Sequence, residues 1–292
     1  MLTSLLSLYF SAFLASAQPL KIETNRSPAA PYKEVLSADP MPVKKIDGNP
    51  GIAASSALIM DLNTGIILWE KDMNTRRPIA SITKIMTALV VLEENSLNDI
   101  VKISQTASGI EGSRIWLAAG EKVSVRDLLY ATLIHSANDA AFALAEYNAG
   151  SIKGFVDKMN TKAQQLELEN THFSNPVGFD GPENYSTAQD IAKLGRYAYR
   201  NSFLRHATAI SKMEFTSVRG TVFKLENTNV LLEKDTRFRG LKTGHTTDAG
   251  YSFVGVAEAK NTHPVVTMVF NSPNRFQESI DLLNWVEEHY QW

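Results

Sequence analysis

The 292-residue chain contains no cysteine. This absence excludes disulfide bonds, cysteine nucleophiles, cysteine-ligated metals and a lipidated N-terminal cysteine. The chain also lacks an excess of charge of either sign, since the net charge is −2 at pH 7 and no long run of like charges occurs. Nucleic-acid binding therefore has no electrostatic support. The six histidines form no pair at helical i, i+4 spacing, so neither a metal nor another cofactor is expected.

After residue 18 the chain has no hydrophobic run long enough to span a membrane. Residues 1–17 carry no charged side chain and end in Ala15-Ser16-Ala17, a small-x-small cleavage pattern. We therefore expect a signal peptide over residues 1–17 and export to the periplasm or the extracellular space. An uncleaved N-terminal membrane tether is the alternative, because the basic n-region of a signal peptide is missing and the first basic residue is Lys21.

Proline is concentrated in residues 18–50, which hold six of the eleven prolines and a single aromatic residue, Tyr32. Such a composition is typical of an extended linker. The rest of the chain, residues 51–292, is expected to form one folded domain. The whole chain is 44% hydrophobic, which is enough to bury a substantial core.

Strand patterns lie at both ends of the expected domain, and helical patterns fill its middle. The clearest strand-like runs are 55–60, 66–70, 251–257 and 264–270. From Arg275 to Trp292 an apolar face at helical spacing predicts a closing helix. The simplest packing is an α/β (α+β) architecture, with an antiparallel sheet built from both termini, flanked by helices, and a helical subdomain.

The only Ser-x-x-Lys motif, Ser81 to Lys84, opens an apolar run that predicts a buried helix. The three-residue spacing places the hydroxyl and the amine on one face of the first helical turn. A serine nucleophile needs this arrangement if a lysine is to accept its proton. The alternative is that Ser81 only caps the helix and that Lys84 is a solvated surface charge.

A lysine that acts as a base needs a lowered pKa. A free lysine has a pKa of about 10.4, so only roughly 0.04% of it is neutral at pH 7. A pKa of about 7.5 requires about 4 kcal/mol of differential solvation. Burial, a helix N-terminus and a second cation all act in this direction. The motif therefore predicts an apolar helix and another Lys or Arg facing the site.

Two further motifs follow in order along the chain. Ser136-Ala137-Asn138 lies in the turn between two expected helices, where a side chain is displayed rather than packed. Lys242-Thr243-Gly244 lies on an expected strand. Ser-x-x-Lys, Ser-x-Asn and Lys-Thr-Gly together are the motifs of penicillin-binding proteins and β-lactamases. His135 is interpreted as structural, because adjacent residues do not face each other on a helix.

Longer strings around these motifs resemble the low-molecular-mass D-alanyl-D-alanine carboxypeptidases, which are serine peptidases of family S11. The strings are 79–88, 136–141, 171–178, 185–188, 227–232 and 240–246. The resemblance covers about residues 52–290. It implies a β-lactamase/transpeptidase-like fold and makes residues 51–292 a serine DD-peptidase catalytic domain.

The resemblance also implies catalytic roles. Ser81 would be acylated by the D-alanyl carbonyl of a peptidoglycan stem peptide, and Lys84 would be its general base. Ser136 would relay a proton to the leaving group. Backbone N–H groups of Ser81 and His245 would form the oxyanion hole, where loss of one donor typically costs about 3–4 kcal/mol.

Substrate-binding roles are implied for five residues. Asn138 would hold the substrate amide. Lys242, with Thr243, would seat the terminal carboxylate and supply the second cation near the lysine base. Gly244 would let the substrate backbone lie close along the strand. His245 matches many carboxypeptidases, but the chemistry does not require its imidazole.

The implied partners are peptidoglycan stem peptides, with β-lactams as covalent inhibitors, in cell-wall biogenesis and cell shape. Larger relatives carry a second β-rich domain and a C-terminal amphipathic anchor, whereas this sequence stops at Trp292. No C-terminal membrane anchor is therefore expected. A DD-endopeptidase of peptidoglycan cross-links is the first alternative, because it shares every residue above.

Two other functions are less favoured. A β-lactamase needs a deacylation base, and Glu167 and Glu169 do not stand at the required spacing from Asn170. A non-catalytic peptidoglycan- or penicillin-binding module would tolerate loss of the nucleophile or the base, and both are present here.

Overall fold

The computed structural model describes residues 40–292, so the expected signal peptide and residues 18–39 of the expected linker lie outside the described residues. Part of the remaining expected linker is paired with the C-terminal end of the chain. Strand β1 (Val43–Lys44) runs antiparallel to β13 (Tyr290–Gln291). The Lys45 N–H also donates to the His289 carbonyl over 2.7 Å. A linker boundary at residue 50 stays a prediction.

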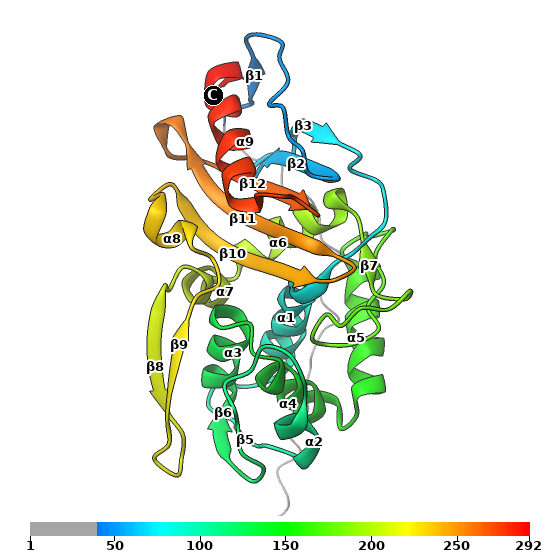
Figure 1. The fold of residues 1–292 in the computed structure, drawn as a ribbon, viewed down its shortest axis with the longest axis vertical. Helices are drawn as coiled ribbons and strands as arrows, with labels where there is room; N and C mark the ends of the chain where they lie inside the picture. Colours follow the sequence, from blue (N-terminus) through cyan, green and yellow to red (C-terminus); the bar gives the residue numbers. More distant parts are fainter. Residues whose placement is uncertain (1–39) are drawn as a thin grey trace, which may run out of the picture. The chain divides into compact units, whose positions relative to one another are not determined.

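A five-stranded antiparallel sheet forms the centre of the described part of the chain (Figure 1). Its order is β10 (Phe238–Thr246), β11 (Gly250–Ala259), β12 (His263–Phe270), β2 (Ser56–Asp61) and β3 (Ile67–Lys71). Strands from the two ends of the domain meet where β12 pairs with β2, with Thr267 opposite Ile59. The expected sheet built from both ends is therefore confirmed. Strand β10, which carries Lys242-Thr243-Gly244, lies at one edge of the sheet.

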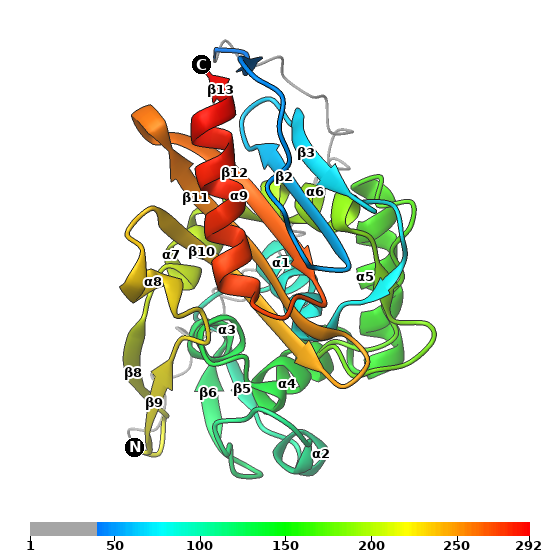
Figure 2. The same cartoon turned by 45° about the horizontal axis from the view of Figure 1, so that its top comes forward.

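Helices cover both faces of this sheet (Figures 1 and 2). Helix α9 (Arg275–His289) packs on one face against β11 and β12, and α6 (Ala188–Arg200) packs on the other. The fully buried Leu282, Leu283 and Val286 supply the apolar side of α9. The closing helix was expected to reach Trp292, but it ends at His289, because Tyr290 is extended and pairs with β1.

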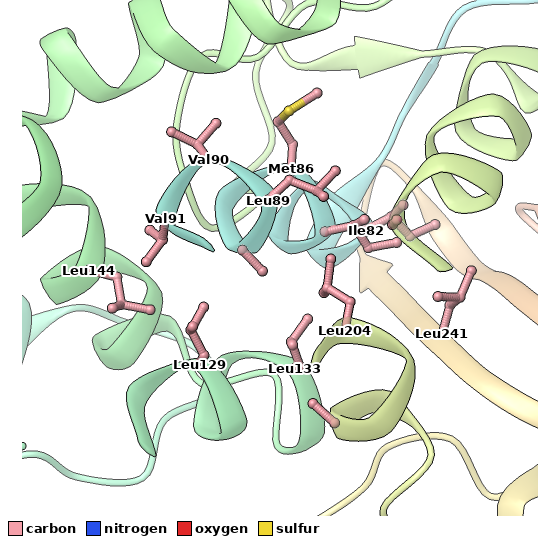
Figure 3. Close-up of a cluster of buried hydrophobic side chains, with 14 of the residues drawn as sticks. Ile82, Met86, Leu89, Val90, Val91, Leu129, Leu133, Leu144, Leu204 and Leu241 are labelled. Atoms are coloured by element: carbon pink, nitrogen blue, oxygen red, sulfur yellow. The ribbon is translucent and has the colours of Figure 1, made fainter. Parts of the chain in front are cut away.

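Helix α1 (Lys84–Glu94) runs through the centre of the helical subdomain. Its residues from Lys84 to Val91 are all buried, which is the pattern of a helix enclosed on every side. Figure 3 shows one side of α1, with Val91, turned toward α3 (Val125–Ile134), α4 (Asn138–Ala149), α7 (Ser202–Thr208) and β10, whereas Met86 and Val90 point to the opposite side. The labelled neighbours are Leu129, Leu133, Leu144, Leu204 and Leu241.

Local sequence signals set the helix ends that matter for the site. The Ser124 hydroxyl caps α3 by accepting the Asp127 N–H over 3.1 Å. Gly150 ends α4 in the left-handed conformation, at φ +70°. Thr187 caps α6 by accepting the Asp190 N–H. Each of these three ends carries a residue type that is favoured at such a position.

The remaining elements are short, apart from one helix. They are β4 (Arg77–Pro78), η1 (Ala80–Thr83), β5 (Ile100–Lys102), α2 (Gln105–Gly109), β6 (Lys122–Ser124), α5 (Ile152–Gln165), β7 (Tyr185–Ser186), β8 (Lys212–Thr216), β9 (Val222–Glu226), α8 (Leu231–Lys234) and η2 (Lys260–Thr262). Among residues 40–292, no helix has both the length and the hydrophobicity that a bilayer span requires.

Candidate active site

The nucleophile candidate and its base lie on consecutive helical segments. Ser81 lies in the short 3₁₀ segment η1, and Lys84 is the first residue of α1. The Lys84 Nζ is 2.8 Å from the Ser81 Oγ and 2.7 Å from the Val177 carbonyl oxygen. A neutral amine placed between two oxygens can accept the serine proton while it donates to the carbonyl.

The surroundings of Lys84 favour this neutral form. Its side chain is fully buried, and burial lowers the pKa of Lys84 well below its usual value. The positive charge of Lys242 lowers this pKa further, and the negative charge of Asp139 opposes the shift. An apolar helix and a second cation were expected beside the base, and the structure places both there.

The loop that follows α5 holds the other side of Lys84. The Asn175 Oδ1 accepts the N–H groups of Val177, Gly178 and Phe179 over 3.2, 2.7 and 3.0 Å. Gly178 has φ +92°, and a Cβ atom there would lie 1.9 Å from the Ala80 carbonyl oxygen. Only glycine therefore allows the loop to lie flat against the nucleophile turn and aim the Val177 carbonyl at Lys84.

The Ser136-Ala137-Asn138 motif lies in the turn between α3 and α4, as expected, but Ser136 is only 5% exposed, so it is not displayed to solvent as the turn position suggested. Ser136 adopts the left-handed conformation at φ +62°, and its side chain bonds to no residue between 40 and 292. The Asn138 N–H and side-chain amide donate to the carbonyls of Ser113 and Glu111, each over 2.7 Å. The segment around Gly112 packs closely on this amide, since a Cβ atom there would lie 2.6 Å from the Asn138 Nδ2.

Lys242 places a second cation inside the fold. Its side chain is fully buried, and the Nζ donates to the Thr243 carbonyl over 3.2 Å. Burial, together with the nearby Arg275 guanidinium, lowers the pKa of Lys242 to about 7. A buried cation that is so weakly compensated favours a bound anion, which would restore its charge.

The rest of the Lys-Thr-Gly strand packs on the nucleophile turn. The Thr243 hydroxyl lies 2.6 Å from the Thr228 hydroxyl. A Cβ atom at Gly244 would lie 3.1 Å from the Ile79 carbonyl oxygen, so glycine lets β10 approach η1 closely. This packing gives Gly244 a role in addition to the one implied for the substrate backbone. The exposed His245 ring stacks on Tyr251, with ring centroids 4.1 Å apart.

Three residues at the site were missed by the reasoning from sequence. Arg275 donates to the Gly244 carbonyl over 2.8 Å, although it is the first residue of the closing helix. Asp139 is fully buried and accepts backbone N–H groups from the 115–117 segment. Thr228 fixes the Thr243 hydroxyl. The available signal for Asp139 was an acidic residue in the first turn of a helix, where the helix dipole favours it.

These contacts give the arrangement that a serine acyl-transfer site of the Ser–Lys type requires. Residues 43–274 match the family model described as D-alanyl-D-alanine carboxypeptidase, peptidase family S11. The D-alanyl-D-alanine carboxypeptidase of Streptomyces sp. strain K15 is 36% identical over 256 residues, which cover 81% of this chain and 88% of the relative. The crystal structure of the Streptomyces K15 DD-transpeptidase has a TM-score of 0.78 at 34% identity, covering 82% of this chain and 99% of that one. The chain therefore belongs to the D-alanyl-D-alanine carboxypeptidase family S11.

Other relatives differ in length and in named activity. The carboxypeptidase DacA of Haemophilus influenzae is 36% identical over 248 residues, covering 81% of this chain. This chain spans only 62% of that relative and 57% of the carboxypeptidase DacF of Bacillus subtilis. The D-alanyl-D-alanine endopeptidase of Escherichia coli is 34% identical over 247 residues, covering 82% of this chain and 78% of the relative. Family membership alone therefore does not distinguish carboxypeptidase from endopeptidase activity.

Proposed function

We propose that this chain is a serine D-alanyl-D-alanine carboxypeptidase that cleaves peptidoglycan stem peptides through an acyl-enzyme on Ser81. The observation that carries the proposal is the 2.8 Å contact between the Ser81 Oγ and the Nζ of the fully buried Lys84. Burial keeps the amine available as a base, and membership of the family supports the substrate class.

The contact between Ser81 and Lys84 supports the following course of acylation. The Ser81 Oγ attacks the carbonyl carbon between the two D-alanines, and its proton passes to the Lys84 Nζ. Backbone N–H groups of Ser81 and His245 hold the oxyanion. When the intermediate collapses, the C–N bond breaks and the leaving amine takes a proton through the Ser136 hydroxyl. Lys84 returns to the neutral form by supplying that proton.

Deacylation uses the same groups in the reverse direction. Water attacks the ester carbonyl, and the neutral Lys84 accepts its proton. The ester C–O bond then breaks, Ser81 regains its proton from Lys84, and the shortened peptide leaves as a carboxylate after its acid proton passes to water. The Asn138 side chain holds the peptide amide through both steps.

The terminal D-alanine carboxylate is assigned to Lys242, Thr243 and Arg275. Burial and the second positive charge favour an anion at this place. The Thr243 hydroxyl is oriented by Thr228 and adds a neutral donor. β-Lactams carry a reactive amide and a carboxylate in similar positions, so we expect them to acylate Ser81 as covalent inhibitors.

Cleavage of D-alanyl cross-links is the second candidate, which the likeness to the Escherichia coli endopeptidase favours. Both substrates lie in the cell wall, so either activity requires action outside the cytoplasm. The signal peptide over residues 1–17, the N-terminal tether and a role in cell shape stay predictions.

The test uses two purified muropeptides, a pentapeptide monomer that ends in D-Ala-D-Ala and a D-alanyl cross-linked dimer, with products read by mass. Loss of one alanine from the monomer supports the carboxypeptidase, and splitting of the dimer supports the endopeptidase. Ser81→Ala and Lys84→Gln should abolish either reaction. Lys153→Gln is the matched control, because its side chain is 85% exposed on a surface helix. If the wild-type protein is folded and yields no product from either muropeptide, the peptidase proposal is wrong.

A further inference from the structure

The segment 111–117 forms the wall of the site next to Asn138. It accepts both hydrogen bonds of Asn138, at the Ser113 and Glu111 carbonyls. It belongs to the helical subdomain, whereas Lys242 and Arg275 come from β10 and α9. If the terminal carboxylate of a peptide binds Lys242 and Arg275, the acyl portion of that peptide, upstream of the scissile bond, can reach this wall.

Trp116 is held out from this wall into solvent. The residue is 71% exposed, more than any other large hydrophobic residue between 40 and 292. Its backbone has φ +66°, a left-handed conformation that is strained for a bulky residue. The residues on either side enforce it, because the N–H groups of Ile115 and Leu117 donate to the Asp139 carboxylate over 3.3 and 3.0 Å.

Asp139 is fully buried and directly follows Asn138 in the sequence. The same buried carboxylate therefore fixes Trp116 relative to the substrate-binding amide. An exposed indole held in this way has no packing role in the core, and it differs from a surface aromatic residue that is free to move.

Arg114 adds a positive charge to the exposed ring. Its guanidinium carbon lies 3.8 Å from the centre of the Trp116 ring, and one nitrogen donates to the Ile110 carbonyl over 3.2 Å. Within residues 40–292 it has no acidic partner. The stacked guanidinium keeps N–H groups that can bind a carboxylate, and it is held in one orientation by the ring.

We propose that Arg114 and Trp116 form a subsite for the acyl portion of the stem peptide and select a side chain that ends in a carboxylate. Arg114 pairs with that carboxylate, and the indole covers the methylene groups that lead to it. The inference rests on the proposed function, because the proposed reaction determines which end of the peptide lies at Asn138. It adds a source of specificity on the side of the scissile bond away from Lys242.

The test compares two synthetic peptides that end in D-Ala-D-Ala and differ only upstream, where one side chain ends in a carboxylate and the other in a carboxamide. We expect Arg114→Gln to raise KM about 2- to 5-fold for the carboxylate peptide alone, with kcat unchanged, since an exposed charge pair is weak. Trp116→Ala should raise KM for both peptides, and Trp116→Phe should restore most of the loss. Arg205→Gln is the matched control, because Arg205 also stacks on an aromatic ring, that of Tyr199, and donates to a backbone carbonyl.

The proposal would be overturned if Arg114→Gln left the preference for the carboxylate peptide unchanged. It would also be overturned if Arg114→Gln raised KM equally for both peptides. The acylation rate with a β-lactam that lacks this side chain should be the same in all variants, which shows that the catalytic groups are intact. Calorimetric binding of the two peptides to Ser81→Ala separates this proposal from the proposed function. A preference that Arg114→Gln abolishes supports the subsite even without turnover, and absence of any preference refutes it.

Discussion

Gly178→Ala tests whether the loop after α5 positions the lysine base. The added Cβ atom would lie 1.9 Å from the Ala80 carbonyl oxygen and 2.8 Å from the Ser81 backbone nitrogen. Ordinary carbon contacts begin at about 3.5 Å, so the loop must retreat by more than about 1 Å. The φ of +92° also disfavours alanine at this position. Both effects act on the backbone beside the nucleophile and leave Ser81 and Lys84 chemically unchanged.

Retreat of the loop carries the Val177 carbonyl away from Lys84. The contact of 2.7 Å would open beyond about 3.5 Å, where it is no longer a hydrogen bond. A displacement of about 1 Å in a catalytic group typically lowers the rate about 100-fold. We therefore expect the second-order rate constant for acylation of Ser81 to fall about 100-fold in Gly178→Ala.

The assay is stopped-flow acylation by a fluorescent penicillin, with thermal unfolding measured in parallel. Gly181→Ala is the matched control in the same loop, because a Cβ atom there meets nothing within 4 Å. It should acylate at the wild-type rate. If Gly178→Ala is folded and its acylation rate constant lies within about threefold of the wild-type value, the loop does not position the base and the argument is refuted.

Three further predictions concern the anion site, its hydroxyl pair and the packing of the closing helix. The pKa of Lys242 is about 7, so its charge is lost as the pH rises through that value. In the serine-to-alanine variant of the nucleophile, the affinity for a peptide with a free C-terminal carboxylate should fall up to about tenfold per pH unit above 7, as read by calorimetry. A C-terminally amidated peptide should show no such fall, and a parallel fall for both would contradict the assignment. Thr228→Val removes the hydroxyl that orients Thr243, so KM for the pentapeptide should rise about 5-fold with little change in kcat. Thr228→Ser should restore the value, and unchanged kinetics in the valine variant would show that the pair is not used. Glu278 is buried and accepts two backbone N–H groups that precede β2, so Glu278→Gln should cost about 2 kcal/mol and lower Tm by about 4–8 °C. Glu288→Gln, exposed on the same helix, should leave Tm unchanged, and equal Tm values for the two variants would contradict this reading.

The sequence was informative where chemistry and periodicity coincide. The Ser81–Lys84 spacing predicted both the contact and the need for a buried base, because three residues along a helix return a side chain to the same face. Alternating and helical patterns likewise predicted the sheet built from both ends. Such features depend on residues that are close in sequence or on a period that the chain repeats.

The missed features depend on contacts between distant segments. Val177 acts through its backbone carbonyl, so its side chain gives no signal. Arg275 reaches the site from the first turn of a helix that packs on the opposite face of the sheet. Trp116 has a left-handed backbone because Asp139, far along the chain, binds its neighbours. Single-sequence periodicity contains none of this information.

The pairing of β12 with β2 also governs when the protein becomes active. This central pairing joins the first strand of the sheet to one of the last, and the sheet brings β10 against η1. Ser81 and Lys84 become neighbours as soon as their own helix forms, but the anion site depends on strands and a helix near the end of the chain. Because contacts between distant segments close late, catalytic competence should appear only when the domain is almost complete. A partly folded chain would then hold its nucleophile and base in place without binding a substrate that could acylate the nucleophile.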